Sequence, residues 1–471
     1  MKISQRLVGV VLSTVLVQAR NVFYYDEEHP HLPDAKVTAD VDHVNIAYSK
    51  SSIFTTNPAG EYAPFKDLSS LKTHFKPGTK FLISIGGWGD NVGFRKGAAT
   101  EDSRKLFASN VAKVLKNLSL DGVDIDWRYP GGNGYDYRQV PNSDLAAETD
   151  TYPLLLSEIR SAIGTEKILS IVAPGKTEDM IAYTPQNATS IWNLVDWVNV
   201  MTYDLMNRRD GITKHHTDVQ TSLKIVDHYI NDLKLDPHKI NLGFAMYAKW
   251  FKVDPTEKCE TGLGCITLLL ETQDGSDTQS SGSITFETAN LAPPPSNITE
   301  STDGTCGPEI SMTCKKGHCC SIYGYCGNTE DYCNNCEDVA YGSGCQTVSL
   351  KTQFQNAILN GTTDSKMGGQ YYYDRARNIF WTWETPDLIA QKFEKIMAAR
   401  KLGGVMVWSL GQDSYENSHI NAIRKGNSYL KDPSANQKTK SNNVVSPIQS
   451  TQSPQPQPKP QPTKTHWWKF W

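Results

Sequence analysis

The sequence lacks an excess of either charge, and it lacks cysteine everywhere outside one short window. Of its 471 residues, 47 are Lys or Arg and 51 are Asp or Glu, so the net charge is −4. A chain so close to neutral shows no charge signal for a nucleic-acid partner. After the first twenty residues, no stretch is long and apolar enough for a transmembrane helix. The hydrophobic fraction of 38% supports a sizeable core, but it is a little low for a wholly globular chain and indicates a polar segment.

The N-terminal residues 1–19 have the pattern of a secretory signal peptide. Lys2 and Arg6 precede a mostly apolar run, and Val17-Gln-Ala19 fits a small-residue cleavage site. Export predicts an oxidising compartment in which cysteines pair. We therefore expect a secreted protein, which could associate with a cell wall. Four Asn-x-Ser/Thr sequences agree with export and are candidate glycosylation sites: Asn117, Asn187, Asn297 and Asn360.

Apolar, β-branched runs alternate with helical patterns from residue 21 onward. Helical patterns cover, for example, 102–117, 152–163 and 222–233. Such alternation predicts parallel βαβ units, and eight strands are the number that closes a (β/α)8 TIM barrel in an α/β fold. A doubly wound open sheet is the alternative. The eight strand candidates are 21–26, 43–49, 80–87, 121–127, 167–173, 196–203, 239–247 and 403–410.

The regular spacing fails between the seventh and eighth strands, where about 150 residues intervene, too many for a simple loop. All ten cysteines lie there, between Cys259 and Cys345. After residue 431 the chain turns to Ser, Gln, Pro and Lys. The predicted domains are a barrel at 20–250 and 366–430, an insertion at 251–365 that contains a cysteine-rich module at 303–347, and a disordered tail at 432–471.

The strongest signal for chemistry lies in the fourth strand, Asp121-Gly-Val-Asp-Ile-Asp-Trp-Arg-Tyr-Pro130. On a strand, Asp124, Asp126 and Arg128 share one face. In a barrel they would point inward near the C-terminal end, where barrel active sites lie. Charged groups in that position are costly unless they are paired or serve a function. A cluster of ion pairs that satisfy one another is the alternative interpretation.

This motif resembles the signature of glycoside hydrolase family 18, the class V chitinases, and especially their fungal secreted members. The family also inserts a domain between strands seven and eight. The resemblance covers about residues 21–430 and implies chitin or N-acetylglucosamine oligomers as partners; we expect no cofactor and no metal. Four further stretches match in the same order: Ser84-Ile-Gly-Gly-Trp88, Met201-Thr-Tyr-Asp204, Gly243-Phe-Ala-Met-Tyr247 and Gly404-Val-Met-Val-Trp408.

The resemblance implies a substrate-assisted retaining hydrolysis, in which the acetamide oxygen of the substrate is the nucleophile. By position, Asp126 would orient the acetamide, with Asp124 behind it. Tyr203 would donate a hydrogen bond to the same group. The implied sugar contacts are Trp88, Tyr129, Met201, Asp204 and Trp408, with Trp408 as the hydrophobic floor.

One residue departs from the family pattern at the decisive position. The family has Glu, the general acid, where this chain has Arg128. An arginine has no dissociable proton near neutral pH, and losing a general acid typically costs about 10²–10⁴-fold in rate. We also expect Arg128 to pair with Asp124 or Asp126. Two smaller departures are Lys249, where the family often has Arg, and Gly411, where an acid is common.

Eight cysteines lie between Cys306 and Cys345, and spacing alone leaves 105 possible connectivities. A segment this short needs disulfides to hold it together. A zinc cluster is less favoured for an exported chain. We expect His215-His216, on the loop after the sixth strand, to be solvated rather than metal-bound.

The string from Cys319 to Cys333 resembles the hevein-like chitin-binding module (type 1). The resemblance implies sugar contacts by Ser321, Tyr323, Tyr325 and Tyr332, whereas a purely structural disulfide knot is the alternative. It also implies the pairs Cys306–Cys320, Cys314–Cys326, Cys319–Cys333 and Cys336–Cys345, and the two remaining cysteines, Cys259 and Cys265, should pair locally.

Three functions therefore compete. The first is a chitin-binding protein of the chitinase family with little or no hydrolysis, because Arg128 replaces the acid. The second is a working endochitinase that uses a substitute acid. The third is a structural or interaction protein of the cell wall, with the barrel as a scaffold. We favour the first, because the site rather than the fold decides function.

Overall fold

The computed structural model describes residues 19–287, 295–308, 310–321, 323–333, 336, 340–345 and 349–431. Residues 1–18 of the expected signal peptide and the expected tail at 432–471 lie outside this part of the chain.

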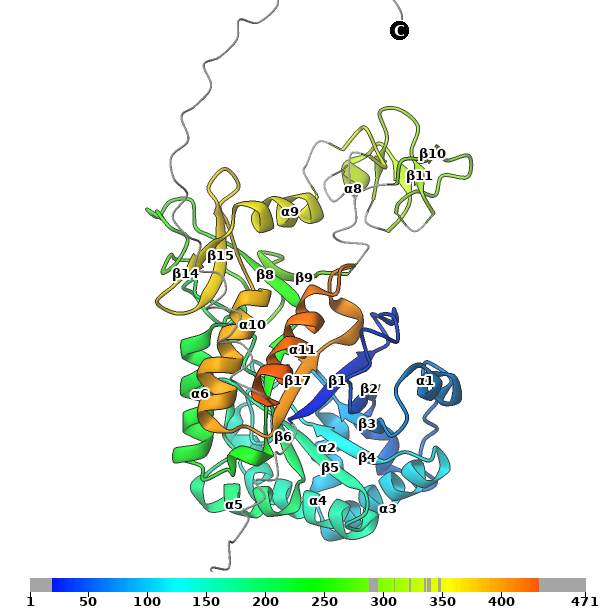
Figure 1. Cartoon of the computed structure of the whole chain (residues 1–471), viewed down its shortest axis with the longest axis vertical. Helices are drawn as coiled ribbons and strands as arrows, with labels where there is room; N and C mark the ends of the chain where they lie inside the picture. The colour runs from blue at the N-terminus through cyan, green and yellow to red at the C-terminus, as the bar shows by residue number, and fades with distance from the viewer. Residues whose placement is uncertain are drawn as a thin grey trace, which may run out of the picture. The chain divides into compact units, whose positions relative to one another are not determined.

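Eight parallel strands form a closed barrel, which confirms the predicted α/β barrel over the open sheet (Figure 1). Around the barrel the strands follow the order β1, β2, β3, β4, β5, β6, β7, β17 and back to β1. Their bounds are β1 Arg20–Asp26, β2 His43–Ser49, β3 Lys80–Gly86, β4 Gly122–Asp126, β5 Ile168–Ala173, β6 Trp197–Val200, β7 Ile240–Ala245 and β17 Gly404–Trp408.

The helices between these strands cover the outside of the barrel and close one large apolar core. Their starts follow ordinary capping chemistry: Thr100 accepts a hydrogen bond from the backbone of Ser103 at the start of α3, and Asp218 does the same for Thr221 at α6. No described helix combines the length and apolarity that crossing a bilayer requires. The helices are α1 Leu68–His74, α2 Val92–Ala98, α3 Glu101–Asn117, α4 Glu148–Ile163, α5 Pro185–Leu194, α6 Val219–Asn231, α10 Pro386–Lys392 and α11 Ser418–Lys431.

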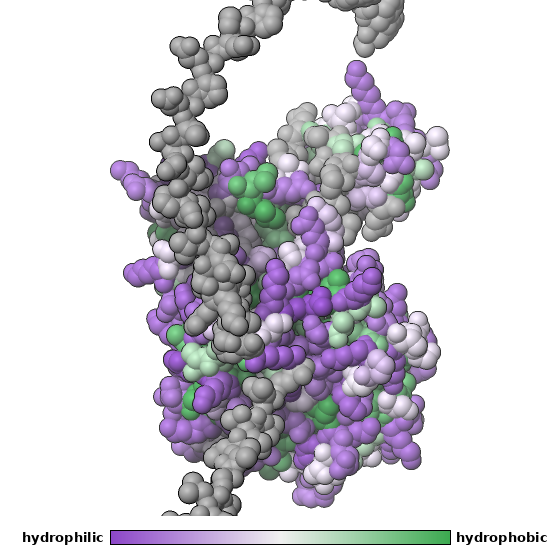
Figure 2. Space-filling view, in the orientation of Figure 1, coloured by the Kyte–Doolittle hydropathy of each residue, from purple (hydrophilic) through white to green (hydrophobic). Residues whose placement is uncertain are grey.

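Strand β4 separates its side chains as the alternation predicts. Val123 and Ile125 pack outward in the core between strands and helices. Just beyond the strand, Trp127 also packs outward and stacks on Phe94, with ring centroids 5.2 Å apart. Hydrophilic residues cover most of the barrel face in Figure 2, as expected when apolar side chains fill the interior.

Asp124 lies inside the barrel and is completely buried. Its carboxylate accepts four hydrogen bonds, from Tyr24 Oη at 2.7 Å, Ser84 Oγ at 2.8 Å, Ser170 Oγ at 2.6 Å and Asn199 Nδ2 at 3.1 Å. Burial nevertheless raises the pKa of Asp124 to about 6, since the hydrogen bonds offset only part of the cost of removing the charge from water.

The insertion between β7 and β17 contains a five-stranded antiparallel sheet in the order β14-β15-β16-β8-β9. Aromatic side chains form its core: Phe354 stacks on Trp381, and Trp250 packs beside Trp381. Strands β15 and β16 of this sheet lie after residue 365, where we expected the insertion to end. The bounds are β8 Tyr247–Lys252, β9 Ser281–Thr285, α9 Leu350–Asn360, β14 Thr362–Asp364, β15 Gly369–Asp374 and β16 Ile379–Trp383.

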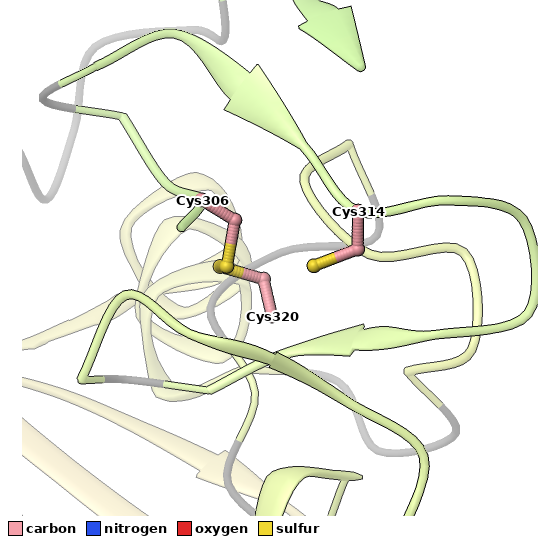
Figure 3. Close-up of side chains that lie close together, drawn as sticks. All are labelled: Cys306, Cys314 and Cys320. Carbon is pink, nitrogen blue, oxygen red and sulfur yellow. A yellow bond between two sulfur atoms is a disulfide. The ribbon is translucent and has the colours of Figure 1, made fainter. Parts of the chain in front are cut away.

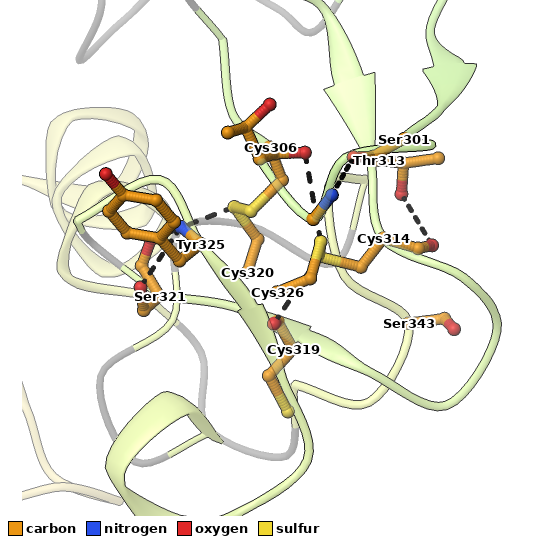
Figure 4. Close-up of a disulfide and its surroundings, with 12 residues drawn as sticks. Ser301, Cys306, Thr313, Cys314, Cys319, Cys320, Ser321, Tyr325, Cys326 and Ser343 are labelled. Carbon is orange, nitrogen blue, oxygen red and sulfur yellow. Dashed lines mark hydrogen bonds between the residues drawn. A yellow bond between two sulfur atoms is a disulfide. The ribbon is translucent and has the colours of Figure 1, made fainter.

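The cysteine-rich segment has almost no apolar core of its own. Its buried cluster contains Cys306, Cys314, Cys320 and Tyr341, so sulfur takes the place of aliphatic side chains (Figure 4). Five disulfides join Cys259–Cys265, Cys306–Cys320, Cys314–Cys326, Cys319–Cys333 and Cys336–Cys345. Its short elements are β10 Thr299–Glu300, β11 Met312–Thr313, β12 Cys319–Cys320, β13 Cys326–Gly327 and α8 Glu330–Cys333.

The burial of Asp124 predicts a distinct pH dependence of stability. In the unfolded chain its pKa returns to about 3.8, so between pH 4 and 6 the folded protein holds more protons than the unfolded one. The unfolding free energy contributed by this group therefore falls as pH rises, by up to about 3 kcal/mol. Asp124→Asn should remove this decline, measured by urea unfolding from pH 4 to pH 7. Asp102→Asn, at the exposed start of α3, is the matched control. Equal pH slopes for wild type and Asp124→Asn would contradict the prediction.

Candidate active site

A cleft of about 1050 Å³ opens at the C-terminal ends of the barrel strands. Barrel active sites lie at this end, because the loops that follow the strands converge there. Asp124 and Asp126 lie beneath the cleft on β4, both fully buried. Seven of the residues that the sequence indicated line it together: Trp88, Arg128, Tyr129, Met201, Tyr203, Asp204 and Trp408.

Arg128 pairs with Asp126 through a two-pronged interaction. Its Nε donates to Asp126 Oδ1 and its Nη2 to Asp126 Oδ2, both at 2.7 Å. The expected pairing of Arg128 with one of the two aspartates is thereby confirmed. The structure selects Asp126, because the carboxylate of Asp124 already accepts four hydrogen bonds from neighbouring strands.

Tyr48, at the end of β2, completes this ion pair and was missed in the sequence. Its hydroxyl donates to Asp126 Oδ2 at 2.8 Å and accepts from Arg128 Nη2 at 3.1 Å. Both oxygens of Asp126 are therefore occupied by protein donors. No local pattern marks Tyr48, because its role depends on a residue 80 positions away.

The charge of Arg128 is fixed by these neighbours. Burial alone would lower the pKa of the guanidinium. The carboxylate of Asp126 and the oxygen of Tyr48 raise it by more, so the pKa lies well above its usual value. Arg128 is therefore a permanent cation while the protein is folded. A guanidinium held in this state cannot release a proton near neutral pH.

Trp408 forms one wall of the cleft, at the end of β17. The ring is half-buried and packs on Tyr48 in a stacked arrangement, with centroids 5.4 Å apart and planes 21° apart. Tyr24 packs against it at the same centroid distance. An exposed aromatic face with polar neighbours suits the apolar face of a sugar ring.

Lys249, one of the two smaller departures from the motif pattern, forms an ion pair in the cleft. Its Nζ lies 2.9 Å from Asp204 Oδ1, and Tyr247 donates to the same oxygen at 2.8 Å. The backbone of Asp204 has a φ of 56°, in the left-handed region that Asp tolerates better than most residues. Asp204 is thus held on the cleft surface by two partners.

Gly411, the other departure from the motif pattern, has no room for a side chain. A Cβ atom there would lie 2.0 Å from the carbonyl oxygen of His29. Any side chain at residue 411 therefore requires the backbone near His29 to move, which explains why glycine fits this packing.

The expectation that His215 and His216 are solvated is wrong. Both are buried, because the five-stranded sheet of the insertion covers this loop. His215 Nε2 lies 3.2 Å from Asp364, and the backbone N–H of His216 donates to Thr382 Oγ1 at 3.4 Å. Burial lowers the pKa of His216 to about 3, so its ring is neutral.

Within the described ranges, one group of side chains is close enough to hold a metal: Cys306, Cys314 and Cys320. Their sulfurs already belong to disulfides, as Figure 3 shows for Cys306 and Cys320. A disulfide sulfur is not a thiolate, which is the form that binds metal. These residues are therefore structural.

The predicted sugar contacts of the cysteine-rich segment differ in exposure. Tyr323 is 79% exposed and Tyr325 58% exposed. Ser321 accepts a hydrogen bond from the backbone of Tyr325 at 3.3 Å (Figure 4). Tyr332 lies flat against Gly327, where a Cβ atom would lie 2.2 Å from the ring. Two exposed rings and a supporting serine thus lie on one short segment.

The chain is similar in sequence to known chitinases over part of its length. The chain is 36% identical to Chitinase A1 of Niallia circulans over 155 residues, which cover 32% of this chain and 21% of that protein. It is 28% identical to Chitinase 1 of Aphanocladium album over 202 residues, 41% of this chain and 46% of that protein. The chain thus spans less than half the length of either relative.

A solved structure has the same fold. A mutant of the GH18 chitinase of Cycas revoluta, in complex with (GlcNAc)4, superposes with a TM-score of 0.56 at 17% identity, over 88% of this chain and 100% of that one. The profile of the glycosyl hydrolases family 18 matches residues 20–413. With the closed barrel and the matching motifs around its mouth, the chain belongs to glycosyl hydrolase family 18.

Proposed function

We propose that this chain is a secreted, chitin-binding protein of the class V chitinase type in which hydrolysis is lost or strongly impaired. The observation that carries the proposal is the ion pair of Arg128 with Asp126 at the position of the general acid. A family member that hydrolyses chitin needs a group there that gives a proton to the leaving oxygen and later takes one back. Arg128 can do neither.

The ion pair also removes Asp126 from its expected role. In a substrate-assisted reaction this carboxylate should orient the acetamide of the substrate. Here its two oxygens accept from Arg128 and Tyr48 at 2.7–2.8 Å. Breaking such a buried pair leaves an uncompensated charge, which typically costs about 3–5 kcal/mol. The substrate would have to supply that energy before any bond could react.

Three acids on the cleft surface are paired with cations, which bears on whether they could replace the proton donor. A substitute acid must be protonated at the start of the reaction, whereas a neighbouring cation stabilises the ionised carboxylate. Asp204 meets this obstacle, because despite its burial Lys249 holds the pKa of its carboxyl below the usual value. Asp179 and Glu271 also pair with cations, Arg209 and Arg138, but burial raises the pKa of both carboxyls.

The cysteine-rich segment supports the chitin-binding part of the proposal. Tyr323 and Tyr325 present exposed rings that suit the apolar face of N-acetylglucosamine, and the buried Ser321 accepts a hydrogen bond from the backbone of Tyr325. The disulfides join the same cysteines as the hevein-like pattern implies. We propose residues 303–347 as this module and 251–365 as the main part of the insertion, whose sheet also includes β8, β15 and β16, with the rest of 20–250 and 366–430 as the barrel.

Export of the chain is consistent with the signal-like residues 1–19 and with five disulfides. Asn117, Asn297 and Asn360 are exposed, as glycan attachment requires. Asn187 is half-buried and its amide donates to the carbonyl oxygen of Thr149 at 2.8 Å, so a glycan there would compete with that contact. We propose glycans at all four sites, with Asn187 the least accessible.

Restoring the acid tests the loss of hydrolysis. Wild-type protein should release no measurable product from a fluorogenic chitobiose analogue. Arg128→Glu should raise kcat/KM by about 10²-fold or more, because a proton donor returns to the position. Arg128→Gln, which breaks the ion pair without supplying a proton, is the matched control and should stay inactive. Product release by pure wild-type protein, with a clean Arg128→Ala blank, would sink the proposal in favour of a working endochitinase.

Removing the exposed rings tests the module. Tyr323→Ala with Tyr325→Ala should weaken retention on insoluble chitin by about 10-fold, since each ring loses its stacking contact with a sugar. Tyr415→Ala, another exposed tyrosine that lies outside the module, is the control. Unchanged retention by the double variant would assign chitin binding to the barrel instead.

A further inference from the structure

The guanidinium of Arg128 keeps donors that the protein does not use. A guanidinium carries five N–H groups. Asp126 and Tyr48 take those of Nε and Nη2, and Nη1 has no hydrogen-bond partner in the described part of the chain. The side chain is 14% exposed and lines the cleft. Nη1 is not among the buried unpartnered atoms, so it reaches the cleft and is free to donate to an acceptor that enters there.

The cluster of Arg128, Asp126 and Tyr48 offers hydrogen-bond donors to the cleft but carries little net charge. The carboxylate of Asp126 is fully buried against the guanidinium and balances its charge at 2.7 Å. An anionic ligand would find this cation already neutralised and would be repelled by Asp126. Uncharged oxygens, such as sugar hydroxyl, glycosidic or acetamide oxygens, accept a hydrogen bond without that penalty.

Tyr48 fixes this cluster relative to the aromatic wall. Its hydroxyl is bonded to both Asp126 and Arg128, while its ring stacks on Trp408 at 5.4 Å. One residue therefore sets both the direction of the donors and the position of the ring beside them. Such preorganisation favours binding, because less conformational freedom is lost when the ligand arrives.

We infer that Arg128 is a ligand-binding residue: its Nη1 donates to an uncharged oxygen of a neutral saccharide lying against Trp408, and Tyr48 is the positioning residue for that donor. The substitution of the acid has thus produced a binding contact as well as removing a catalytic one. This inference rests on the proposed function in taking the cleft as a saccharide site, but it does not depend on the loss of hydrolysis.

The test measures the Kd of the N-acetylglucosamine tetramer by calorimetry. The full chain carries Tyr323→Ala and Tyr325→Ala throughout, so that the module does not contribute. Arg128→Lys keeps a cation beside Asp126 but removes the forked donors, and it should weaken binding about 10-fold or more. Arg400→Lys is the matched control, because Arg400 makes the same Nε and Nη2 contacts to Asp227 outside the cleft. It should change Kd less than two-fold.

Tyr48→Phe tests the positioning role. It should weaken binding about three-fold or more alone, but less than two-fold in an Arg128→Gln background, where the donor it positions is gone. A purely structural contribution would weaken binding equally in both backgrounds and would overturn this role. If thermal unfolding shows that Arg128→Lys does not fold, Arg128→Gln, which leaves an amide beside Asp126, decides the role of Arg128 by the same criterion.

Three results would overturn the inference. The first is wild-type or tighter tetramer binding by Arg128→Lys and Arg128→Gln. The second is tighter binding of a galacturonic acid tetramer than of the neutral one, which would indicate an anion site. The third is no tetramer binding at all in the module-deficient background. Hydrolysis is assayed in the same samples, so product release would overturn the proposed loss of activity while leaving the Kd comparison intact.

Discussion

Two buried carboxylates on the inner face of strand β4 determine which polar groups must surround them at the mouth of the barrel. Neither Asp124 nor Asp126 has any exposure to water, so each must be satisfied by the protein or remain protonated. The barrel solves the two problems separately. Neighbouring strands supply neutral donors to Asp124, and a single guanidinium supplies charge and geometry to Asp126. The second solution places a permanent cation, rather than a carboxyl, beside Asp126.

Much of this could be predicted from the sequence, because local backbone geometry enforces it. The alternation of side chains along β4 put Asp124 and Asp126 on one face, and eight repeated strand patterns pointed to a closed barrel. Local pattern could not show which aspartate Arg128 chooses. That choice follows from donors on β1, β3, β5 and β6, which satisfy Asp124 and leave Asp126 available.

Residues that depend on distant parts of the chain were the ones missed. Tyr48 belongs to the site only because β2 closes beside β3 and brings its hydroxyl to Asp126. His215 and His216 looked like loop residues, but they contact Asp364 and Thr382 of the insertion sheet, which lie 149 and 166 positions later. The burial of this loop could not be predicted from its own residues, because it depends on contacts with a distant part of the chain.

Two parts of the chain are stabilised in different ways, one by apolar packing and the other by disulfides. The barrel depends on buried aliphatic and aromatic side chains, whereas the segment from Cys306 to Cys345 has sulfur where a core would be. A reductant should therefore loosen the exposed tyrosine surface while the apolar core of the barrel stays in place; the separate pair Cys259–Cys265, which packs beside Phe251 of the cleft, would open as well. Reduction would therefore act mainly on one of the two candidate sugar-binding surfaces, the tyrosines of the cysteine-rich segment, whereas heat or denaturant would unfold both.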